Sequence, residues 1–168
     1  YPFFFITLSD ERWYPYANKL RWVWAFFLMP FTGMNYRVMF TGERFDKNQQ
    51  YIFCSNHTSI LDIPFFGLFA GDRFRFMAKK EFGDIPIFGM FFRTVDIAVN
   101  RQSKIGAFKA FIEAAQSIDR GYSMVIFPEG TTASNPPELL EFKNGPFKLA
   151  IDKQVPIVPI TFLDNWHL

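Results

Sequence analysis

The sequence has few of the residues from which catalytic and structural sites are most often built. Its 168 residues include a single cysteine, Cys54, which excludes an internal disulfide and any metal site made of several cysteines. That cysteine content is typical of a reducing compartment. There are two histidines, His57 and His167, and the second lies at the C-terminal end. Because zinc sites take three or four ligands, no metal site is expected.

Several common signatures are also missing. The sequence has neither a P-loop nor a G-x-G-x-x-G run, so nucleotide binding of those kinds is excluded. It has no G-x-S-x-G either, since the stretch Gly121–Val125 lacks the closing glycine. Lys and Arg (18) exceed Asp and Glu (16) by only two, far from the basic excess of a nucleic-acid binder.

Apolar and aromatic residues are abundant instead. They include 24 phenylalanines, and 49% of the chain is hydrophobic. One explanation is a large aromatic core, because a chain of this length can bury one as a single domain. The other is that part of this surface lines a lipid-binding groove or faces a membrane. Composition alone does not separate these two interpretations.

Residues 1–40 differ from the rest and are expected to form an N-terminal apolar helical membrane-associating segment ahead of a domain at 41–168. The apolar run Trp22–Phe31 is ten residues long, whereas a spanning helix needs about 20. Lys19 and Arg21 precede this run and tryptophans surround it, which suits a helix lying in a membrane interface. The alternative is a helix packed on the domain's own core. The apolar opening at Tyr1 suggests that the native protein continues upstream.

From residue 36 onward, strand and helix patterns alternate. Strands are expected at 36–41, 51–54, 75–78, 94–99, 123–127 and 157–162, and helices at 60–69, 102–120 and 147–152, with a short helix or loop at 85–93. The 102–120 helix has an apolar stripe at helical spacing, formed by Ile105, Phe108, Ile112, Ala115 and Ile118. This alternation predicts an α/β single domain with a mostly parallel sheet flanked by helices.

Polar residues follow three of the expected strands directly. They are His57, Arg101 and Glu129. Ligands of parallel sheets bind beyond the carboxyl ends of the strands. We therefore expect these three side chains to converge on one site.

His57 and Asp62 are the candidate catalytic pair. Their five-residue spacing does not place both on one helix face. It works if His57 lies in the loop before a helix and Asp62 in its first turn, where the carboxylate reaches Nδ1–H and leaves Nε2 as a base. The alternative is a purely structural helix start with an aspartate in its favourable first turn. The spacing by itself favours that alternative.

A second candidate region is the turn Phe127–Thr132. Gly130 permits close approach of backbone N–H groups, and Thr131 adds a hydroxyl, so the turn suits an anionic or polyol ligand. Arg101 and Lys79 are the candidates to hold a phosphate, the first by a two-pronged contact and the second as a point charge. The alternatives are an ordinary turn and solvated surface charges.

Together these stretches resemble the glycerolipid acyltransferases of the 1-acylglycerol-3-phosphate O-acyltransferase type, which carry four ordered blocks. The matching residues here are Asn56-His57 with Asp62, Ile97–Arg101, Phe127–Ala133 and Val155–Ile160. Softer matches follow at 78–81 and 142–145, and the resemblance spans residues 51–163. Two positions depart from the pattern: Asn100 stands where an aspartate is common, and Thr132 where an arginine is usual.

The resemblance implies transfer of a fatty acyl chain from acyl-CoA or acyl carrier protein to the free hydroxyl of a lyso-glycerophospholipid. The expected reaction converts 1-acyl-glycerol-3-phosphate to phosphatidic acid, without a cofactor, at the cytoplasmic face of a membrane. His57 would be the general base and Asp62 its support, and backbone N–H groups at the first helix start would stabilise the oxyanion.

In the same resemblance, Glu129, Gly130 and Thr131 would bind the acceptor together with Arg101 and Lys79. Because Thr132 removes an expected cation, a different lyso-lipid such as a lyso-aminolipid is an alternative acceptor. A non-catalytic lipid- or carrier-binding module of the same fold is the other alternative. The choice of donor and its chain length stay open.

Overall fold

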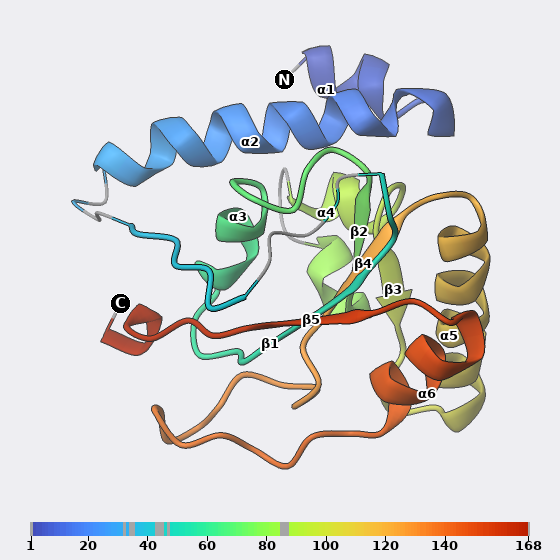
Figure 1. Cartoon of the computed structure of the whole chain (residues 1–168). Helices are drawn as coiled ribbons and strands as arrows, with labels where there is room; N and C mark the ends of the chain where they lie inside the picture. The colour runs from blue at the N-terminus through green and yellow to red at the C-terminus, as the bar shows by residue number, and fades with distance from the viewer. Residues whose placement is uncertain are drawn as a thin grey trace.

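The computed structural model of the chain describes residues 2–31, 33, 36–42, 46, 48–84 and 88–167. Five parallel strands form one sheet, and helices cover both of its faces (Figure 1). The α and β elements are α1 (Pro2–Thr7), α2 (Tyr14–Phe31), β1 (Ile52–Ser55), α3 (Asp62–Phe66), β2 (Phe74–Lys79), α4 (Phe88–Phe92), β3 (Ile97–Val99), α5 (Lys104–Asp119), β4 (Ser123–Ile126), α6 (Gly145–Lys153) and β5 (Ile157–Ile160). Short 3-10 turns are η1 (Glu11–Trp13), η2 (Lys80–Asp84) and η3 (Asn165–His167).

The strand order is β3-β2-β4-β1-β5, so β1 and β4 are neighbours near the middle of the sheet. Every pairing is parallel, which requires a crossover between consecutive strands. The expected α/β architecture, a parallel sheet flanked by helices, is confirmed. Since all five carboxyl ends lie at one edge of the sheet, the loops after β1, β4 and β5 are brought together there.

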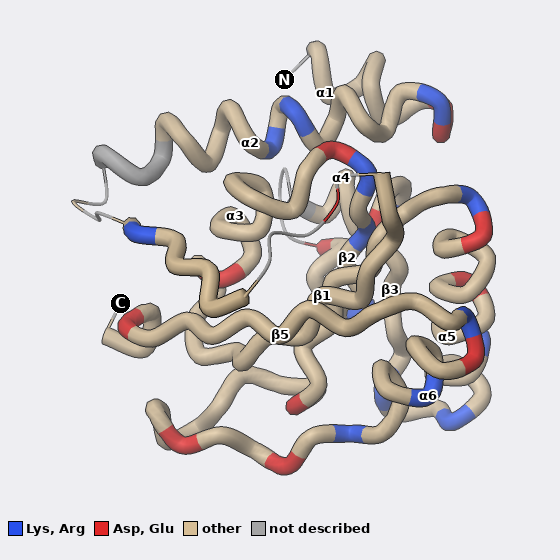
Figure 2. Tube along the Cα trace, viewed as in Figure 1, with Lys and Arg blue, Asp and Glu red and all other residues tan. Residues whose placement is uncertain are grey.

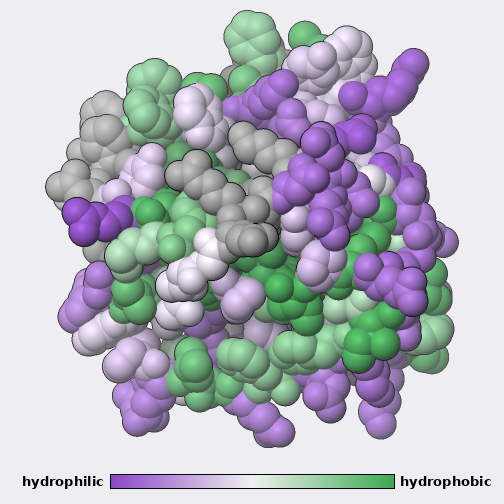
Figure 3. Space-filling model, in the orientation of Figure 1, coloured by the Kyte–Doolittle hydropathy of each residue, from purple (hydrophilic) through white to green (hydrophobic). Residues whose placement is uncertain are grey.

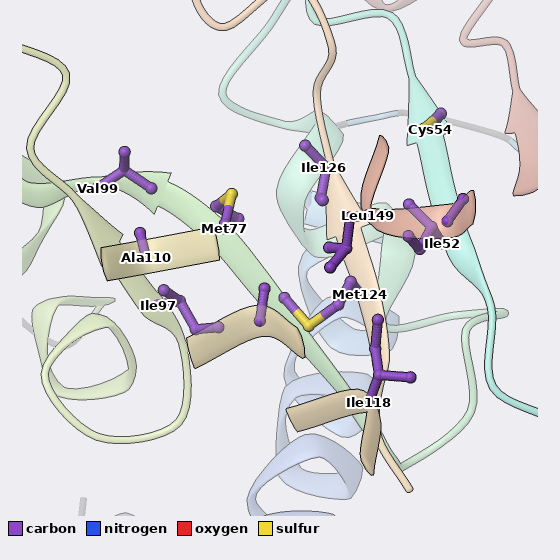
Figure 4. Packing of buried hydrophobic residues seen from close by; sticks show 12 residues of the cluster. Ile52, Cys54, Met77, Ile97, Val99, Ala110, Ile118, Met124, Ile126 and Leu149 are labelled. Carbon is purple, nitrogen blue, oxygen red and sulfur yellow. The ribbon is translucent and has the colours of Figure 1, made fainter. Parts of the chain in front are cut away.

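The two faces of the sheet carry different side chains. One face is built from aliphatic and sulfur-containing residues such as Ile52, Met77 and Met124, which pack on α5 and α6 (Figure 4). Helix α5 meets this face with Ala110 and Ala114, whose small side chains let the helix lie close to the strands. This close packing forms the main core between α5, α6 and the sheet.

The opposite face is aromatic. Phe53, Phe66, Phe74 and Phe76 are each at most 2% exposed and form one cluster under α3. Edge-to-face pairs, for instance Phe66 with Phe76 at 5.7 Å between ring centroids, are the arrangement that ring quadrupoles favour. Many of the phenylalanines therefore lie in the core. This agrees with the explanation of the composition by a large aromatic core.

Helix α2 lies over the rest of the domain and is tied to it by polar contacts (Figure 1). Asn18 is fully buried, and its amide donates to the carbonyl oxygens of Asp72 (3.0 Å) and Phe74 (2.9 Å). The Arg21 guanidinium forms an ion pair with the fully buried Asp96 carboxylate, which also accepts the N–H of Phe76 at 3.0 Å. One face of α2 thus packs on the domain. Within the described part of the chain, no helix is both long and apolar enough to cross a membrane.

The division at residue 40 stays a prediction, and so does the membrane association of residues 1–40.

Two other expectations are wrong. Residues 36–41 form no strand: Tyr36, Val38 and Met39 are exposed, and the sheet ends at β5 on that side. A strand-like sequence needs a partner strand, and this stretch has none in the described chain.

The first part of the apolar stripe of α5 faces away from the core. Ile105 and Phe108 are 71% and 67% exposed, whereas the buried residues of the helix are Ala110, Ala114, Ser117 and Ile118, the last residue of the stripe. Where the helix crosses the strands most closely, its small residues face inward. The ends of the helix follow the sequence signals. Ser103 caps its start by accepting the N–H of Gly106 at 3.1 Å.

Candidate active site

The structure brings His57 and Asp62 into direct contact. His57 lies in the loop that leaves β1, and Asp62 is the first residue of α3. The imidazole Nδ1 lies 2.8 Å from Asp62 Oδ2, and both side chains are almost fully buried. A carboxylate at this distance places the ring proton on Nδ1, which leaves Nε2 with a free lone pair. This arrangement is that of a base held by an orienting acid.

The Asp62 carboxylate is held by four donors. Besides the imidazole, Oδ2 accepts the backbone N–H groups of Thr58 (2.8 Å) and Ser59 (3.0 Å). The other oxygen, Oδ1, accepts the side-chain amide of Asn165 at 2.7 Å. Hydrogen bonds to a charged acceptor are short and strong, so this set fixes the orientation of the carboxylate. It thereby fixes the ring that the carboxylate holds.

Phe127 and Glu129, from the loop after β4, complete the surroundings of His57. The Phe127 ring stacks on the imidazole, with 4.1 Å between centroids and an interplanar angle of 21°. Glu129 is 3% exposed, and its Oε1 accepts the backbone N–H of His57 at 2.9 Å. Its Oε2 accepts the N–H of Leu140 at 2.8 Å. Both carboxylate oxygens of Glu129 therefore accept backbone N–H groups. They connect the loop after β1 to the loop after β4.

The turn at Gly130 wraps around the His57 loop. Gly130 has φ +74°, a conformation that side-chain-bearing residues rarely adopt. The backbone N–H of Ala133 donates to the His57 carbonyl at 2.9 Å, so the turn is tied to the base on its far side too. Thr131 and Thr132 are exposed beside it. Gly130 and Thr131 thus lie next to the catalytic pair, as expected from their place after β4.

Lys79 and Arg101 lie at the same edge of the sheet but further away. Lys79 ends β2, two strands from β1, and Arg101 follows β3, three strands away, which corresponds to roughly 10 and 14 Å at the usual strand spacing. Lys79 pairs with Glu81 at 3.6 Å. Burial lowers the pKa of Arg101, and the nearby Glu81 charge partly offsets that shift. Of the three residues expected to converge, His57 and Glu129 lie in direct contact. Arg101 follows the edge strand β3 and lies further from them.

Backbone N–H groups at the start of α3 are mostly occupied. Those of residues 57–59, 61 and 62 already donate to oxygens of Asp62, Glu129 or Ser59. In this stretch, the N–H of Ile60 is the one without an acceptor among the described residues. The donor set that the resemblance implied for an oxyanion is therefore used to hold the catalytic pair, and Ile60 is the member still available.

Sequence reasoning missed the contribution of the C-terminal stretch after β5. The Asn56 amide group donates to the Phe162 carbonyl at 2.9 Å, and its Oδ1 accepts the Phe162 N–H at 2.8 Å. This two-way contact places Asn165 against Asp62. No local signal could reveal it, because Asn165 and Asp62 are 103 residues apart. The parallel pairing of β5 with β1 is the one feature that indicates the proximity.

An apolar hollow opens on the other side of α3. Its walls include Trp24 of α2, Ile63 and Pro64 of α3, and Phe91 of α4, with Arg21 and Asp96 also among the lining residues. Helix α3 therefore presents Asp62 to His57 and its next two residues to an apolar space. Such a space suits a hydrocarbon group better than a polar one.

Comparison with known proteins agrees with this arrangement. The model of the Acyltransferase family matches residues 37–163, which contain His57, Asp62 and both loops that border them. An uncharacterized acyltransferase of Schizosaccharomyces pombe is 31% identical over 159 residues, covering 92% of this chain and 57% of that protein. The 1-acyl-sn-glycerol-3-phosphate acyltransferase of Helicobacter pylori is 32% identical over 111 residues, covering 66% of this chain and 47% of its own length.

The fold is also that of a solved structure. The 1-acyl-sn-glycerophosphate acyltransferase of Thermotoga maritima superposes with a TM-score of 0.78 at 23% identity, covering 98% of this chain and 66% of that one. The chain spans about half the length of the curated relatives it matches. With a family model that covers the parallel sheet, the His57–Asp62 pair and the Glu129 loop, this chain belongs to the acyltransferase family.

Proposed function

We propose that this chain transfers a fatty acyl group from a thioester donor to the free hydroxyl of a lyso-glycerophospholipid, with 1-acyl-glycerol-3-phosphate as acceptor and phosphatidic acid as product. One observation carries the proposal: a buried carboxylate with four donors holds the His57 ring by Nδ1 and leaves Nε2 free. Binding alone does not require such a base. Relatives named 1-acyl-sn-glycerol-3-phosphate acyltransferase support this choice of acceptor.

In the proposed reaction, His57 Nε2 takes the proton of the acceptor hydroxyl as its oxygen attacks the thioester carbonyl. Asp62 stabilises the imidazolium that forms. The tetrahedral intermediate then collapses, the carbon–sulfur bond breaks, and the imidazolium returns the proton to the departing thiolate. No acyl-enzyme is needed. Cys54 is a poor alternative nucleophile, since burial raises the pKa of its thiol to about 11 and keeps it protonated.

The substrate-binding residues follow from the same geometry. Gly130 and Thr131 lie against the His57 loop and are proposed to contact the acceptor's glycerol. Lys79 and Arg101 are proposed to add positive charge from the far side of the sheet edge. We assign Glu129 a positioning role instead of direct contact, because its two oxygens accept the N–H groups of His57 and Leu140. The donor is acyl-CoA or acyl carrier protein, as co-substrate and without a cofactor.

We also propose that the protein works at the cytoplasmic face of a membrane, which α1 and α2 contact. The outward side of these helices is apolar: Phe3, Phe5, Trp22, Phe26 and Phe27 are 44% to 69% exposed. Charged residues are absent from α1 and from the C-terminal half of α2 (Figure 2), and apolar side chains cover this part of the surface (Figure 3). A helix with one face on the protein and the other apolar suits the membrane interface.

Acyl transfer from labelled acyl-CoA and acyl carrier protein to a panel of lyso-lipids tests the proposal, with His57→Ala beside the wild type. A positioned base contributes roughly 10²- to 10⁴-fold, so His57→Ala should keep its fold and lose nearly all turnover. Equal turnover in the two proteins would refute the mechanism. Because Thr132 lacks the cation usual at its position, product with a lyso-aminolipid alone would keep the mechanism and change the acceptor. Lipid binding without any product would identify a non-catalytic module.

A further inference from the structure

We propose that Lys143 is the phosphate-binding cation of the acceptor site and takes over the task of the arginine that the resembled family carries at the position of Thr132. The inference rests on the proposed function and names a residue that the sequence motifs did not assign to substrate. Lys143 lies in the loop before α6, eleven residues after Thr132.

The Lys143 side chain lies directly over the Gly130 turn. A Cβ placed on Gly130 would be 2.7 Å from the Lys143 ammonium nitrogen and 3.0 Å from Cε. The backbone holds this approach in place, since the Lys143 N–H donates to the Pro128 carbonyl at 2.9 Å. Gly130 therefore serves two purposes: it adopts φ +74°, and it leaves the space that the ammonium group occupies. Any larger residue there would displace the charge.

The ammonium of Lys143 is unpaired in the described part of the chain. Among the residues that the structure describes, no carboxylate lies within ion-pair distance of it and no carbonyl accepts from it, although the loop before α6 carries both acidic and basic residues (Figure 2). By contrast, Lys79 pairs with Glu81 at 3.6 Å, and Glu81 also faces Arg101. Glu81 thus partly neutralises the two cations expected from the motifs. Lys143 has no such acidic partner among the described residues and is available to a ligand.

The Gly130 turn couples this charge to the catalytic pair. Glu129, one residue before, accepts the His57 N–H at 2.9 Å, and Ala133, three residues after, donates to the His57 carbonyl at 2.9 Å. An anion bound at Lys143 would therefore lie at a fixed distance from the base. Thr131 and Thr132 follow Gly130 in the same turn and are exposed. Their backbone N–H groups and hydroxyls have no protein partner among the described residues, so they can add donors for phosphate oxygens.

A phosphate can reach this turn from either substrate, because acyl-CoA also carries phosphates. We assign Lys143 to the acceptor, since an acceptor hydroxyl must sit at His57 and its phosphate lies only a glycerol away. A charged hydrogen bond contributes about 1.5–3 kcal/mol. Lys143→Gln should therefore raise KM for 1-acyl-glycerol-3-phosphate about 10- to 150-fold. KM for acyl-CoA should change less than twofold.

The decisive comparison uses 1-acyl-glycerol, which lacks the phosphate. Lys143→Gln should abolish most of the preference for the phosphorylated acceptor and leave transfer to 1-acyl-glycerol unchanged. Lys148→Gln, an exposed lysine of α6, removes the same charge and should behave as wild type. Adding Thr132→Arg to Lys143→Gln should restore a tenfold preference or more. An equal loss with both acceptors, or a raised KM for acyl-CoA alone, would overturn the assignment.

A binding measurement separates this inference from the proposed function. In the His57→Ala background, calorimetry with a short-chain 1-acyl-glycerol-3-phosphate should give an affinity that Lys143→Gln weakens at least tenfold and Lys143→Arg largely restores. Weakened binding together with an inactive wild type would support Lys143 and refute catalysis. Unchanged binding in Lys143→Gln beside an active wild type would refute Lys143 and leave catalysis intact.

Discussion

Removal of the Asn165 side chain tests whether the C-terminal stretch positions the catalytic pair. Asn165 supplies the one donor to Asp62 Oδ1 in the described chain, at 2.7 Å, whereas Oδ2 has three. Asn165→Ala leaves a buried carboxylate oxygen unpaired. A hydrogen bond to a charged group contributes about 1.5–3 kcal/mol, or about 10- to 150-fold if all of it were lost in the transition state. Because three donors remain, we expect kcat to fall about tenfold.

The assay is steady-state acyl transfer at several acceptor concentrations. Loss of positioning should lower kcat and leave both KM values within twofold, since Asn165 touches neither substrate in the proposed reaction. Asn165→Asp gives a second test. It keeps the shape but sets a carboxylate against Asp62, and the repulsion should make its loss larger than that of Asn165→Ala. Gln116→Ala removes an exposed amide of α5 and serves as the control. A kcat for Asn165→Ala within twofold of wild type would refute the positioning role.

Two further predictions concern stability and the buried thiol. Arg21→Met should destabilise the fold by roughly 3–5 kcal/mol, because it leaves the Asp96 carboxylate buried and unpaired. Arg12→Ala, at an exposed pair with Asp10, should leave the free energy of unfolding nearly unchanged, and denaturant titrations of both variants measure the difference. Burial raises the pKa of Cys54 from 9.0 to about 11, so its contribution to stability is complete below pH 9 and is lost as the pH rises through 11. Iodoacetamide at pH 8 should accordingly label the denatured chain and spare the native one, and fast native labelling would contradict this burial.

The contact between His57 and Asp62 could be expected from the sequence because its geometry is local, although the resemblance, and not the spacing, singled out the two residues. Five residues separate His57 from Asp62, and a loop followed by a helix start brings them into contact wherever the chain ends up. Glu129 was predictable as a neighbour for a different reason, the adjacency of β1 and β4 in a parallel sheet. The hydrogen-bond partners of Glu129 could not be predicted, because its carboxylate accepts backbone N–H groups instead of facing a substrate.

The predictions for α5 and for residues 36–41 were wrong for the same reason. Both depend on packing against other parts of the chain, which a local sequence pattern does not contain. The α5 stripe of Ile105, Phe108 and Ile112 has helical spacing, yet the sheet selected the opposite, alanine-rich side because strands and helix approach closely. Residues 36–41 have strand-like composition but no strand beside them. Asn165 was not expected at the site, and Lys143 was noted only within the softer match at 142–145, because tertiary contacts alone bring both residues there.

Besides its local contacts with Asp62, the loop that carries His57 is held by partners distant in the chain. Its contacts come from residues 72 positions away after β4 and from residues more than 100 positions away after β5. Contacts of such high sequence separation form late, after the intervening chain has closed. We therefore expect the arrangement around His57 to form late in folding and to be lost early if the C-terminal stretch detaches. Partial unfolding of that stretch would silence the enzyme while the sheet and its aromatic core still hold together.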